Sequence, residues 1–158
     1  MKVTNSKPAS TTTEHAFHSL LRCWGLLRQV MEPYFGRHGI SGSQWAVLRV
    51  LQRAEAQGEL SLRLTDRGAR LLIQPPSVTG VVGRLERLGL VARRATGDDA
   101  RVRHVGLTPE GRALVAKVLE RHAGQIESLF DGLTPAERDR LSALLRKLEA
   151  HFETLVAC

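Results

Sequence analysis

The stretch from Leu62 to Arg112 changes its hydrophobic pattern in an order that few folds can accommodate. A short helical pattern is followed by a helix that starts with two prolines, then by two strand-like runs around a charged turn, and then by another helix start. Ten of its residues are arginines and five are acidic, which gives it a net charge of +5 out of the chain's formal +7. Because the positive charge is concentrated in this stretch, we expect it to face a polyanion, with duplex DNA as the first candidate.

Length and composition limit the alternatives. A chain of 158 residues with 42% hydrophobic residues fits one compact domain, or one small domain with an appendage. Residues 1–13 are polar and predict a disordered tail. The sequence has no apolar run as long as a signal-peptide core or a membrane span, which predicts a cytoplasmic protein with no membrane partner. Cys23 and Cys158 match neither a disulfide framework nor a zinc-site spacing, so reduced thiols are expected.

Capping residues indicate where helices begin. Ser41 with Gln44, and Thr134 with Glu137, form capping boxes, and Thr65 and Thr108 are expected to be N-caps. Helix starts are therefore predicted near residues 42, 66, 109 and 135. An earlier helix is expected over about 14–35, with an apolar face made of Phe17, Leu20, Leu21, Trp24, Leu27, Met31 and Tyr34.

The helix that starts with prolines is predicted to read the DNA. It should run over about 75–88, because prolines are tolerated in a first helical turn and Gly89 can end a helix. The short helix expected over 66–72 would pack across it. The predicted core positions are Val78, Val81, Val82, Leu85 and Leu88. The opposite face offers short side chains for close approach to base edges, and arginines for phosphate or guanine, at Ser77, Thr79, Gly80, Gly83, Arg84 and Arg87.

The two strands and their turn predict a wing. The strands are expected over 90–94 and 102–107, around a turn rich in Gly and Asp. Arg101 at its tip would enter the minor groove, whose narrow A/T stretches attract guanidinium groups, and Asp99 would hold that arginine in place. The predicted fold is mainly α with a small antiparallel β wing, a winged helix-turn-helix domain over 39–108 whose wing spans about 91–107. The predicted DNA contacts are Gln74, Pro76, Ser77, Thr79, Gly80, Arg84, Arg93, Arg94, Asp99, Arg101 and Arg103.

These segments resemble the MarR (multiple antibiotic resistance regulator) family. The runs 85–91, 99–101 and 107–111 are similar, at matching spacings, to that family's recognition-helix end, wing and exit-helix start, and 40–48 is similar to the start of its second helix. The likeness extends over about residues 14–156. It implies a dimeric transcription factor, usually a repressor, that binds a pseudo-palindromic operator and responds to a ligand or an oxidant. Departures from the commoner pattern, at Gly68-Ala69, Pro76 and Ala100, keep the operator sequence from being carried over.

Apolar stripes on the terminal helices predict a homodimer independently of that resemblance. One stripe recurs at intervals of four and three and consists of Leu141, Leu145, Leu148, Phe152 and Leu155. The first helix supplies another, which includes Phe17. One small domain cannot cover both stripes, so helices within 14–38 and 109–158 are predicted to pack against a second copy and to place two recognition helices roughly 34 Å apart. Packing of the leucine stripe within one chain is the alternative.

A small aromatic or phenolic effector is the switch that the resemblance implies. A pocket for such a molecule needs aromatic walls, for which Trp24 and Trp45 are candidates, and a cation, for which His18, Arg22 and Arg49 are candidates. A core position is the simpler explanation for either tryptophan taken alone.

Cys23 offers a different switch, because some members of the family sense peroxides through a cysteine in the first helix. A reactive thiol requires an accessible, electropositive setting, which its neighbours Arg22 and Trp24 do not establish. A buried structural cysteine is therefore the simpler expectation. His15 and His18 lie on one helix face, but no cysteine or acidic cluster completes a ligand set, so neither a metal nor another cofactor is predicted.

The sequence does not indicate an enzyme. It has no nucleophile elbow, phosphate loop or paired metal-ligand motif, and the glycines of Gly80-Val81-Val82-Gly83 lie within a predicted helix. The alternative class is an architectural winged-helix protein that binds DNA without responding to a ligand. A footprint over one short inverted repeat favours the regulator, whereas long coverage that is indifferent to sequence favours the architectural protein.

Overall fold

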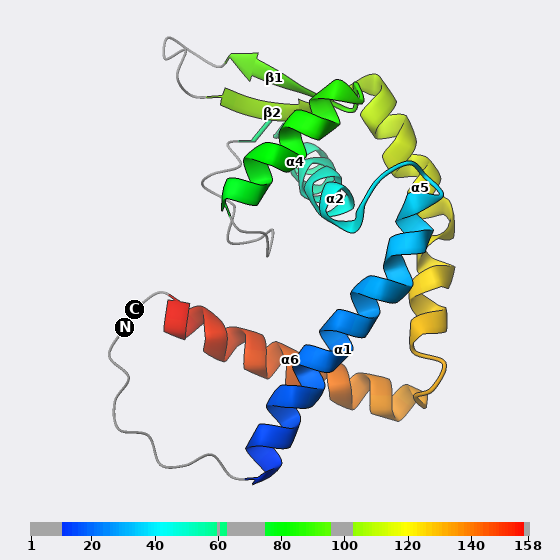
Figure 1. The fold of residues 1–158 in the computed structure, drawn as a ribbon, viewed down its shortest axis with the longest axis vertical. Helices are drawn as coiled ribbons and strands as arrows, with labels where there is room; N and C mark the ends of the chain where they lie inside the picture. Colours follow the sequence, from blue (N-terminus) through cyan, green and yellow to red (C-terminus); the bar gives the residue numbers. More distant parts are fainter. Residues whose placement is uncertain (1–10, 60, 63–74, 96–102, 157–158) are drawn as a thin grey trace. The chain divides into compact units, whose positions relative to one another are not determined.

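The computed structural model describes residues 11–59, 61–62, 75–95 and 103–156. In this part of the chain, five helices and one two-stranded antiparallel sheet are found (Figure 1). Their order is α1 (Thr11–Gly36), α2 (Gly42–Ala56), α4 (Pro75–Arg87), β1 (Val91–Ala95), β2 (Arg103–Leu107), α5 (Pro109–Leu129) and α6 (Pro135–Val156). The mainly α fold with a small antiparallel wing is therefore confirmed. None of these helices has the length and apolar character needed to cross a membrane.

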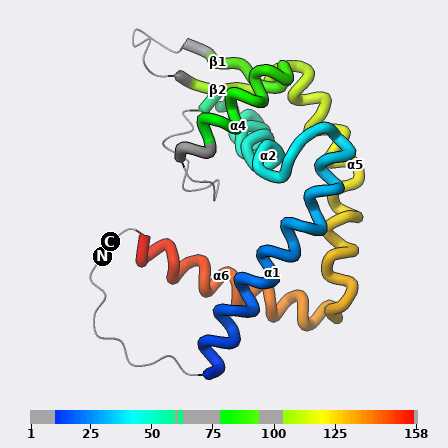
Figure 2. Tube along the Cα trace, in the orientation of Figure 1, coloured from blue at the N-terminus to red at the C-terminus, as the bar shows by residue number. Residues whose placement is uncertain are grey.

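The chain divides into two compact units. The first ends at Val118 and the second begins at Leu119, so α5 starts in one unit and ends in the other. The trace in Figure 2 follows the chain through α2, α4 and the hairpin, which all belong to the first unit. The second unit consists of the end of α5, a turn, and α6.

Three predicted helix caps are present. At the start of α2, the Ser41 hydroxyl accepts a hydrogen bond of 3.3 Å from the amide of Gln44, whose side chain accepts one of 2.7 Å from the amide of Ser41. Thr134 and Glu137 make the same reciprocal pair at the start of α6. The Thr108 hydroxyl accepts a hydrogen bond from an amide in the first turn of α5. These contacts satisfy amide groups that a helix start leaves without a partner. Thr65 lies outside the described residues.

The core of the first unit lies among α2, α4, the hairpin and the first part of α5. The largest fully buried side chains are Leu48, Leu85, Leu107, Val47, Val81, Val115 and Val118. The hairpin pairs Val91 with Leu107 and Arg93 with Val105. Leu62 extends this pairing, because its amide and carbonyl both bond to Val105 at 2.9 Å. The sheet thus holds the end of α4 against a core that α2 completes.

Several details differ from the predictions. Thr11, Thr12 and Thr13 belong to α1, so the disordered tail predicted over 1–13 is wrong for these three residues, and Glu14 in the first turn is favourably placed toward the helix dipole. Leu88 was predicted to be core, but its side chain is 52% exposed. The reason is that α4 ends at Arg87 and Gly89, with φ of 70°, then turns the chain. The helix predicted over 66–72 lies outside the described residues.

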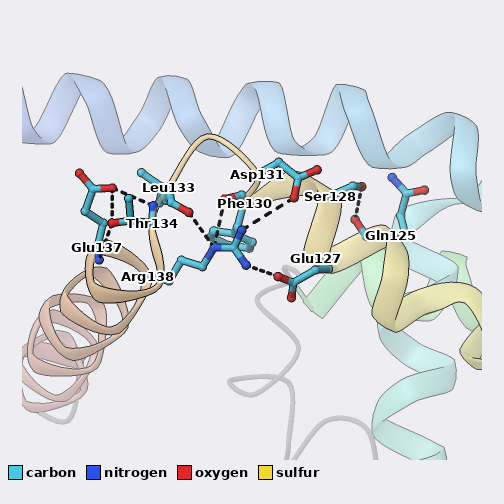
Figure 3. A network of polar contacts seen from close by, with 9 residues as sticks. All are labelled: Gln125, Glu127, Ser128, Phe130, Asp131, Leu133, Thr134, Glu137 and Arg138. Atoms are coloured by element: carbon cyan, nitrogen blue, oxygen red, sulfur yellow. Dashed lines mark hydrogen bonds and ion pairs between the residues drawn. The ribbon is translucent and has the colours of Figure 1, made fainter.

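One arginine closes the turn between α5 and α6 (Figure 3). The Arg138 guanidinium donates hydrogen bonds of 3.1 and 3.0 Å to the backbone carbonyls of Phe130 and Leu133, and it pairs with the carboxylates of Glu127 and Asp131. It therefore satisfies carbonyl groups beyond the end of α5, where the helix can no longer do so. No pattern in the sequence indicates this role.

Candidate DNA interface

The two faces of α4 differ sharply. Val78, Val81, Val82 and Leu85 are buried, as predicted. The opposite face presents Thr79, Gly80, Arg84 and Arg87 to solvent and leaves Gly83 half-buried. One side of the helix is therefore fixed by the core, while the other combines small residues with two cations.

Two glycines make the exposed face of α4 shallow. Among the residues that the structure describes, a Cβ at Gly80 would meet only Nη1 of Arg84, at 3.8 Å, and a Cβ at Gly83 would have no neighbour within 4 Å. A glycine within a helix costs roughly 0.5–1 kcal/mol relative to alanine. The described part of the fold does not require that cost, since none of its residues would clash with a Cβ at either position. The absence of side chains at these positions leaves room for another molecule to approach the helix backbone.

Three arginines border this face in different ways. Nη1 of Arg84 lies over Gly80, and Nε of Arg87 donates a hydrogen bond of 3.4 Å to the carbonyl of Gly83. Arg93, on β1, forms an ion pair with Glu86 of α4, with 3.0 Å between Nε and Oε2. Both partners of this pair are about a third exposed, so solvent screens the pair. The sequence pattern alone gave no role to Glu86.

The turn at Gly89 explains how Glu86 and Arg93 meet. The amide of Leu90 bonds to the carbonyl of Leu85 at 3.0 Å, and the amide of Gly89 bonds to that of Glu86 at 2.9 Å. These bonds end α4 and reverse the chain into β1. The sequence does contain a helix end, a glycine and a strand in this order, and that order could have predicted that Glu86 and Arg93 lie close together.

The predicted DNA contacts fall into three groups. Thr79, Gly80 and Arg84 lie on the exposed face of α4, and Arg93 is exposed on the adjacent strand. The backbones of four others lie in α4 and the two strands, but their side chains are not among those described: Pro76, Ser77, Arg94 and Arg103. Gln74, Asp99 and Arg101 lie outside the described residues, as does the turn of the wing.

The end of α4 is tied directly to the start of α5. The Thr108 hydroxyl donates a hydrogen bond of 2.7 Å to the carbonyl of Gly89, and the Thr108 amide donates one of 3.1 Å to that of Leu90. Gly111 packs so closely on Leu90 that a Cβ would lie 2.0 Å from its carbonyl oxygen. Only glycine fits at this contact without a shift of the backbone.

A second contact holds the start of α5 against α2. Arg112 donates hydrogen bonds to both carboxylate oxygens of Glu55, at 2.6 to 2.9 Å. These hydrogen bonds are the main cause that raises the pKa of Arg112 above its ordinary value. The two residues are 57 positions apart, and no pattern in the sequence indicated that they pair.

The candidate effector residues divide between α1 and α2. Trp45 is buried with its ring 5.6 Å from that of Phe35, and the Arg49 guanidinium lies 5.7 Å from the centre of the Trp45 ring. Burial, followed by the neighbouring charge of Arg53, lowers the pKa of Arg49. Arg49 also donates a hydrogen bond of 2.7 Å to Gln52, but the described part of the chain gives it no carboxylate partner. His18, Arg22 and Trp24 are exposed on α1.

Trp45 is therefore buried, as a core position would require, whereas the side chain of Trp24 is 51% exposed. The expectation of a buried Cys23 is wrong, because this cysteine is exposed on α1. Among the described residues of α1, only Met31, Tyr34 and Phe35 are buried. The burial is confined to one end of the helix, which the apolar spacing alone did not reveal.

The apolar stripe of α6 is largely exposed. None of the residues of α6 that the structure describes is buried. Leu145, Phe152 and Leu155 are exposed, Leu141 and Leu148 are half-buried, and Phe17 on α1 is exposed as well. Exposed apolar side chains that follow one face of a helix are typical of an interaction surface.

Comparison with known proteins identifies the family of this chain. The sequence model of the MarR family matches residues 38–102. The homoprotocatechuate degradative operon repressor of Escherichia coli is 31% identical over 84% of this chain and 86% of its own.

Among solved structures, BpsR of Bordetella bronchiseptica, whose DNA binding is regulated by 6-hydroxynicotinic acid, is 30% identical with a TM-score of 0.75, over 85% of this chain and 98% of its own. NadR in complex with 4-hydroxyphenylacetate is 26% identical with a TM-score of 0.71, over 89% and 98%. Helix α4, the hairpin and these similarities all point to the same family. The chain belongs to the MarR family of DNA-binding, winged helix-turn-helix transcriptional regulators.

Proposed function

We propose that this regulator is a homodimeric repressor that a small hydroxylated aromatic acid releases from a pseudo-palindromic operator. The observation that carries the proposal is the guanidinium of Arg49, which lies over the Trp45 ring with no carboxylate partner among the described residues. The repressor role is supported by the E. coli relative, itself an operon repressor. DNA would be read by α4, with Arg84 and Arg87 on its exposed face.

The dimer is supported by α6. A helix without buried side chains gains little from its own hydrogen bonds, because most helical stability in proteins comes from packing an apolar face. A second copy would cover the stripe that includes Leu145 and Phe152. Leu145→Glu should yield a monomer in sedimentation, whereas Ala150→Glu, on the opposite side of the same helix, should stay dimeric.

Truncation gives an independent test. Removing α6 by ending the chain before Thr134 should leave a monomer or an insoluble protein. A soluble dimer that still binds the operator after this truncation would show that the dimer interface does not depend on α6.

The effector class is supported by the chemistry around Arg49. A partly desolvated guanidinium stacked on an indole binds a carboxylate through charge-assisted hydrogen bonds, while the indole packs against an aromatic ring. The two structural relatives are associated with 6-hydroxynicotinic acid and 4-hydroxyphenylacetate, both of which combine a carboxylate with a hydroxylated ring. We infer the same class of effector here.

These two acids are suitable probes. Either should quench tryptophan fluorescence over the concentration range in which it releases operator DNA. Quenching should persist in Trp24→Phe and disappear in Trp45→Phe, since only Trp45 neighbours Arg49. Arg49→Gln should lose the response, while the control Arg53→Gln, exposed on the same helix, should keep it. Release by either acid from Arg49→Gln at wild-type concentrations would contradict the proposed site.

The exposure of Cys23 favours one second candidate, a redox-sensing repressor. Operator binding by the wild-type chain and by Cys23→Ser would be compared with and without an organic hydroperoxide. Release of the wild-type chain alone supports this switch, and equal release of both proteins contradicts it. A footprint confined to one inverted repeat would separate either repressor from an architectural DNA-binding protein.

A further inference from the structure

Two charged side chains stand at the unfavourable ends of their helices. Glu55 lies in the last turn of α2, and Arg112 lies in the first turn of α5. The amino end of a helix carries partial positive charge and the carboxyl end partial negative charge, so each residue is repelled by its own helix. The helix dipole therefore disfavours both choices.

The contact between the two side chains accounts for both. Nε of Arg112 lies 2.8 Å from Oε1 and 2.9 Å from Oε2 of Glu55, and Nη2 lies 2.6 Å from Oε1. A guanidinium that engages both oxygens of a carboxylate fixes an orientation as well as a distance, because both groups are planar. The Glu55 side chain is 21% exposed and that of Arg112 is 41% exposed, so the pair borders on solvent.

The same turn of α5 is held at a second place. Thr108 donates hydrogen bonds to the carbonyls of Gly89 and Leu90, directly after α4, and Gly111 packs closely against the carbonyl of Leu90. One attachment point fixes where a helix begins, whereas a second point, on another element, also fixes the direction in which it continues. The second point here is the Glu55–Arg112 fork on α2.

We propose that Glu55 and Arg112 are positioning residues for operator binding. Their fork sets the direction in which α5 leaves the first unit. It thereby sets the spacing of the two operator half-sites that a dimer accepts. This inference rests on the dimer proposed above. Neither residue needs to touch DNA for this role, which acts through the geometry of a helix that continues beyond the first unit.

The test uses the full chain and the inverted repeat that the wild-type chain selects from randomised duplexes. Affinities are measured for that repeat, for versions with the spacer changed by one base pair, and for an isolated half-site. The wild-type chain should lose about tenfold or more in affinity when the spacer changes, since half-site spacing follows the geometry of the dimer. The variants are Glu55→Gln, Arg112→Gln and the charge swap Glu55→Arg with Arg112→Glu, with Lys117→Gln as the control on α5.

Both single variants should reduce the preference for the selected spacing to about threefold or less, through loss of the geometric constraint. Their general electrostatic effects have opposite signs, because one removes a negative and the other a positive charge, so half-site affinity should rise slightly in the first and fall slightly in the second. A loss of spacing preference shared by both cannot therefore come from charge alone. The control should keep the wild-type preference.

The charge swap should restore that preference, and it places each charge at the favourable end of its helix, which protects against unfolding. Thermal unfolding of each variant verifies its fold. If both single variants keep the full spacing preference, the positioning role is overturned and the dimer stands. If the wild-type chain itself accepts all spacings equally, the dimer proposal is wrong and the positioning role is wrong with it.

Discussion

The hydroxyl of Tyr34 donates a buried hydrogen bond of 2.7 Å to the backbone carbonyl of Val118, 84 positions later in the chain. It joins the end of α1 to α5 within the first unit. The Tyr34 ring also packs edge-on against Phe35 and His38. The tyrosine thus supplies both an apolar ring to the core and a polar contact between two helices.

Tyr34→Phe keeps the ring and removes the hydroxyl, so it should lower the free energy of unfolding by about 1 kcal/mol. Urea denaturation at one fixed protein concentration would measure this. Ser128→Ala is a matched control, because it removes an exposed hydroxyl on α5 that donates a hydrogen bond of 2.9 Å to the carbonyl of Gln125, also on α5. Equal losses in the two variants would show that burial of the Tyr34 bond is unimportant.

Gly111→Ala should disturb the junction between α4 and α5. The added Cβ would lie 2.0 Å from the carbonyl oxygen of Leu90, so the backbone must move, at a cost of about 1–3 kcal/mol. Gly124→Ala is the control on α5, since a Cβ there meets no described residue within 4 Å and should add up to about 1 kcal/mol of stability. The predicted difference in sign between two identical substitutions is measurable by thermal unfolding.

Gly83→Ala should separate folding from DNA binding. The new methyl group has open space and removes a helix-interior glycine, so the chain should gain roughly 0.5–1 kcal/mol. If the exposed face of α4 enters the major groove, the same methyl should weaken operator binding. Gly124→Ala should stabilise the fold without that loss. An unchanged operator affinity in Gly83→Ala would place this face at a distance from the DNA.

Arg84 and Arg87 should contribute to binding in different ways. Arg84→Ala should cost about 1–3 kcal/mol on the selected operator and relax the preference at one base pair, if Arg84 reads a guanine. Loss of Arg87, as a phosphate contact, should weaken binding to all sequences and reduce the salt dependence by about one charge. Binding isotherms at several salt concentrations, on cognate and substituted duplexes, would measure both effects. Identical profiles for the two variants would contradict these roles.

The cap of α6 should make its stability depend on pH. The backbone amide of Thr134, and then its hydroxyl, lower the pKa of Glu137 by hydrogen bonding to the carboxylate. A carboxyl group with a lowered pKa stabilises the folded state above its unfolded pKa of about 4.3. That contribution is lost as the pH falls through the lowered value.

Glu137→Gln should therefore flatten the decline in helix content between about pH 5 and pH 3, followed by circular dichroism. Glu149→Gln, exposed on the same helix, should leave the decline as in the wild-type chain. A profile in which the two substitutions are equivalent would argue against the capping contact.

Local chemistry made part of this structure predictable. The caps at Ser41 and Thr134 involve a residue three positions away, so their pairing can be read along the chain. The same holds for the buried face of α4, whose apolar residues recur with the helical period. The exposure of Leu88 was missed because the helical pattern continues past the point where Gly89 ends it.

Contacts between distant segments were not predictable from these patterns. Glu55 and Arg112 look like solvated charges until the fold brings α2 and α5 together. Arg138 gives no sign in the sequence that it will reach back to Phe130 and Leu133. Glycine patterns did not indicate that Gly111, rather than Gly124, sits against a carbonyl. Such contacts depend on the path of the backbone, which the periodicity of one helix does not specify.

α6 buries none of its described residues within one chain, so in the proposed dimer the stability of this helix depends on the protein concentration. Dilution shifts the balance toward unassembled chains, in which Leu145 and Phe152 are open to proteases and chaperones. The number of chains per cell would then determine both how much protein escapes degradation and what fraction of it is dimeric and able to bind two half-sites. Operator occupancy would fall more steeply than in proportion to the amount synthesised, which gives a cell a sharp threshold below which the regulated genes are free.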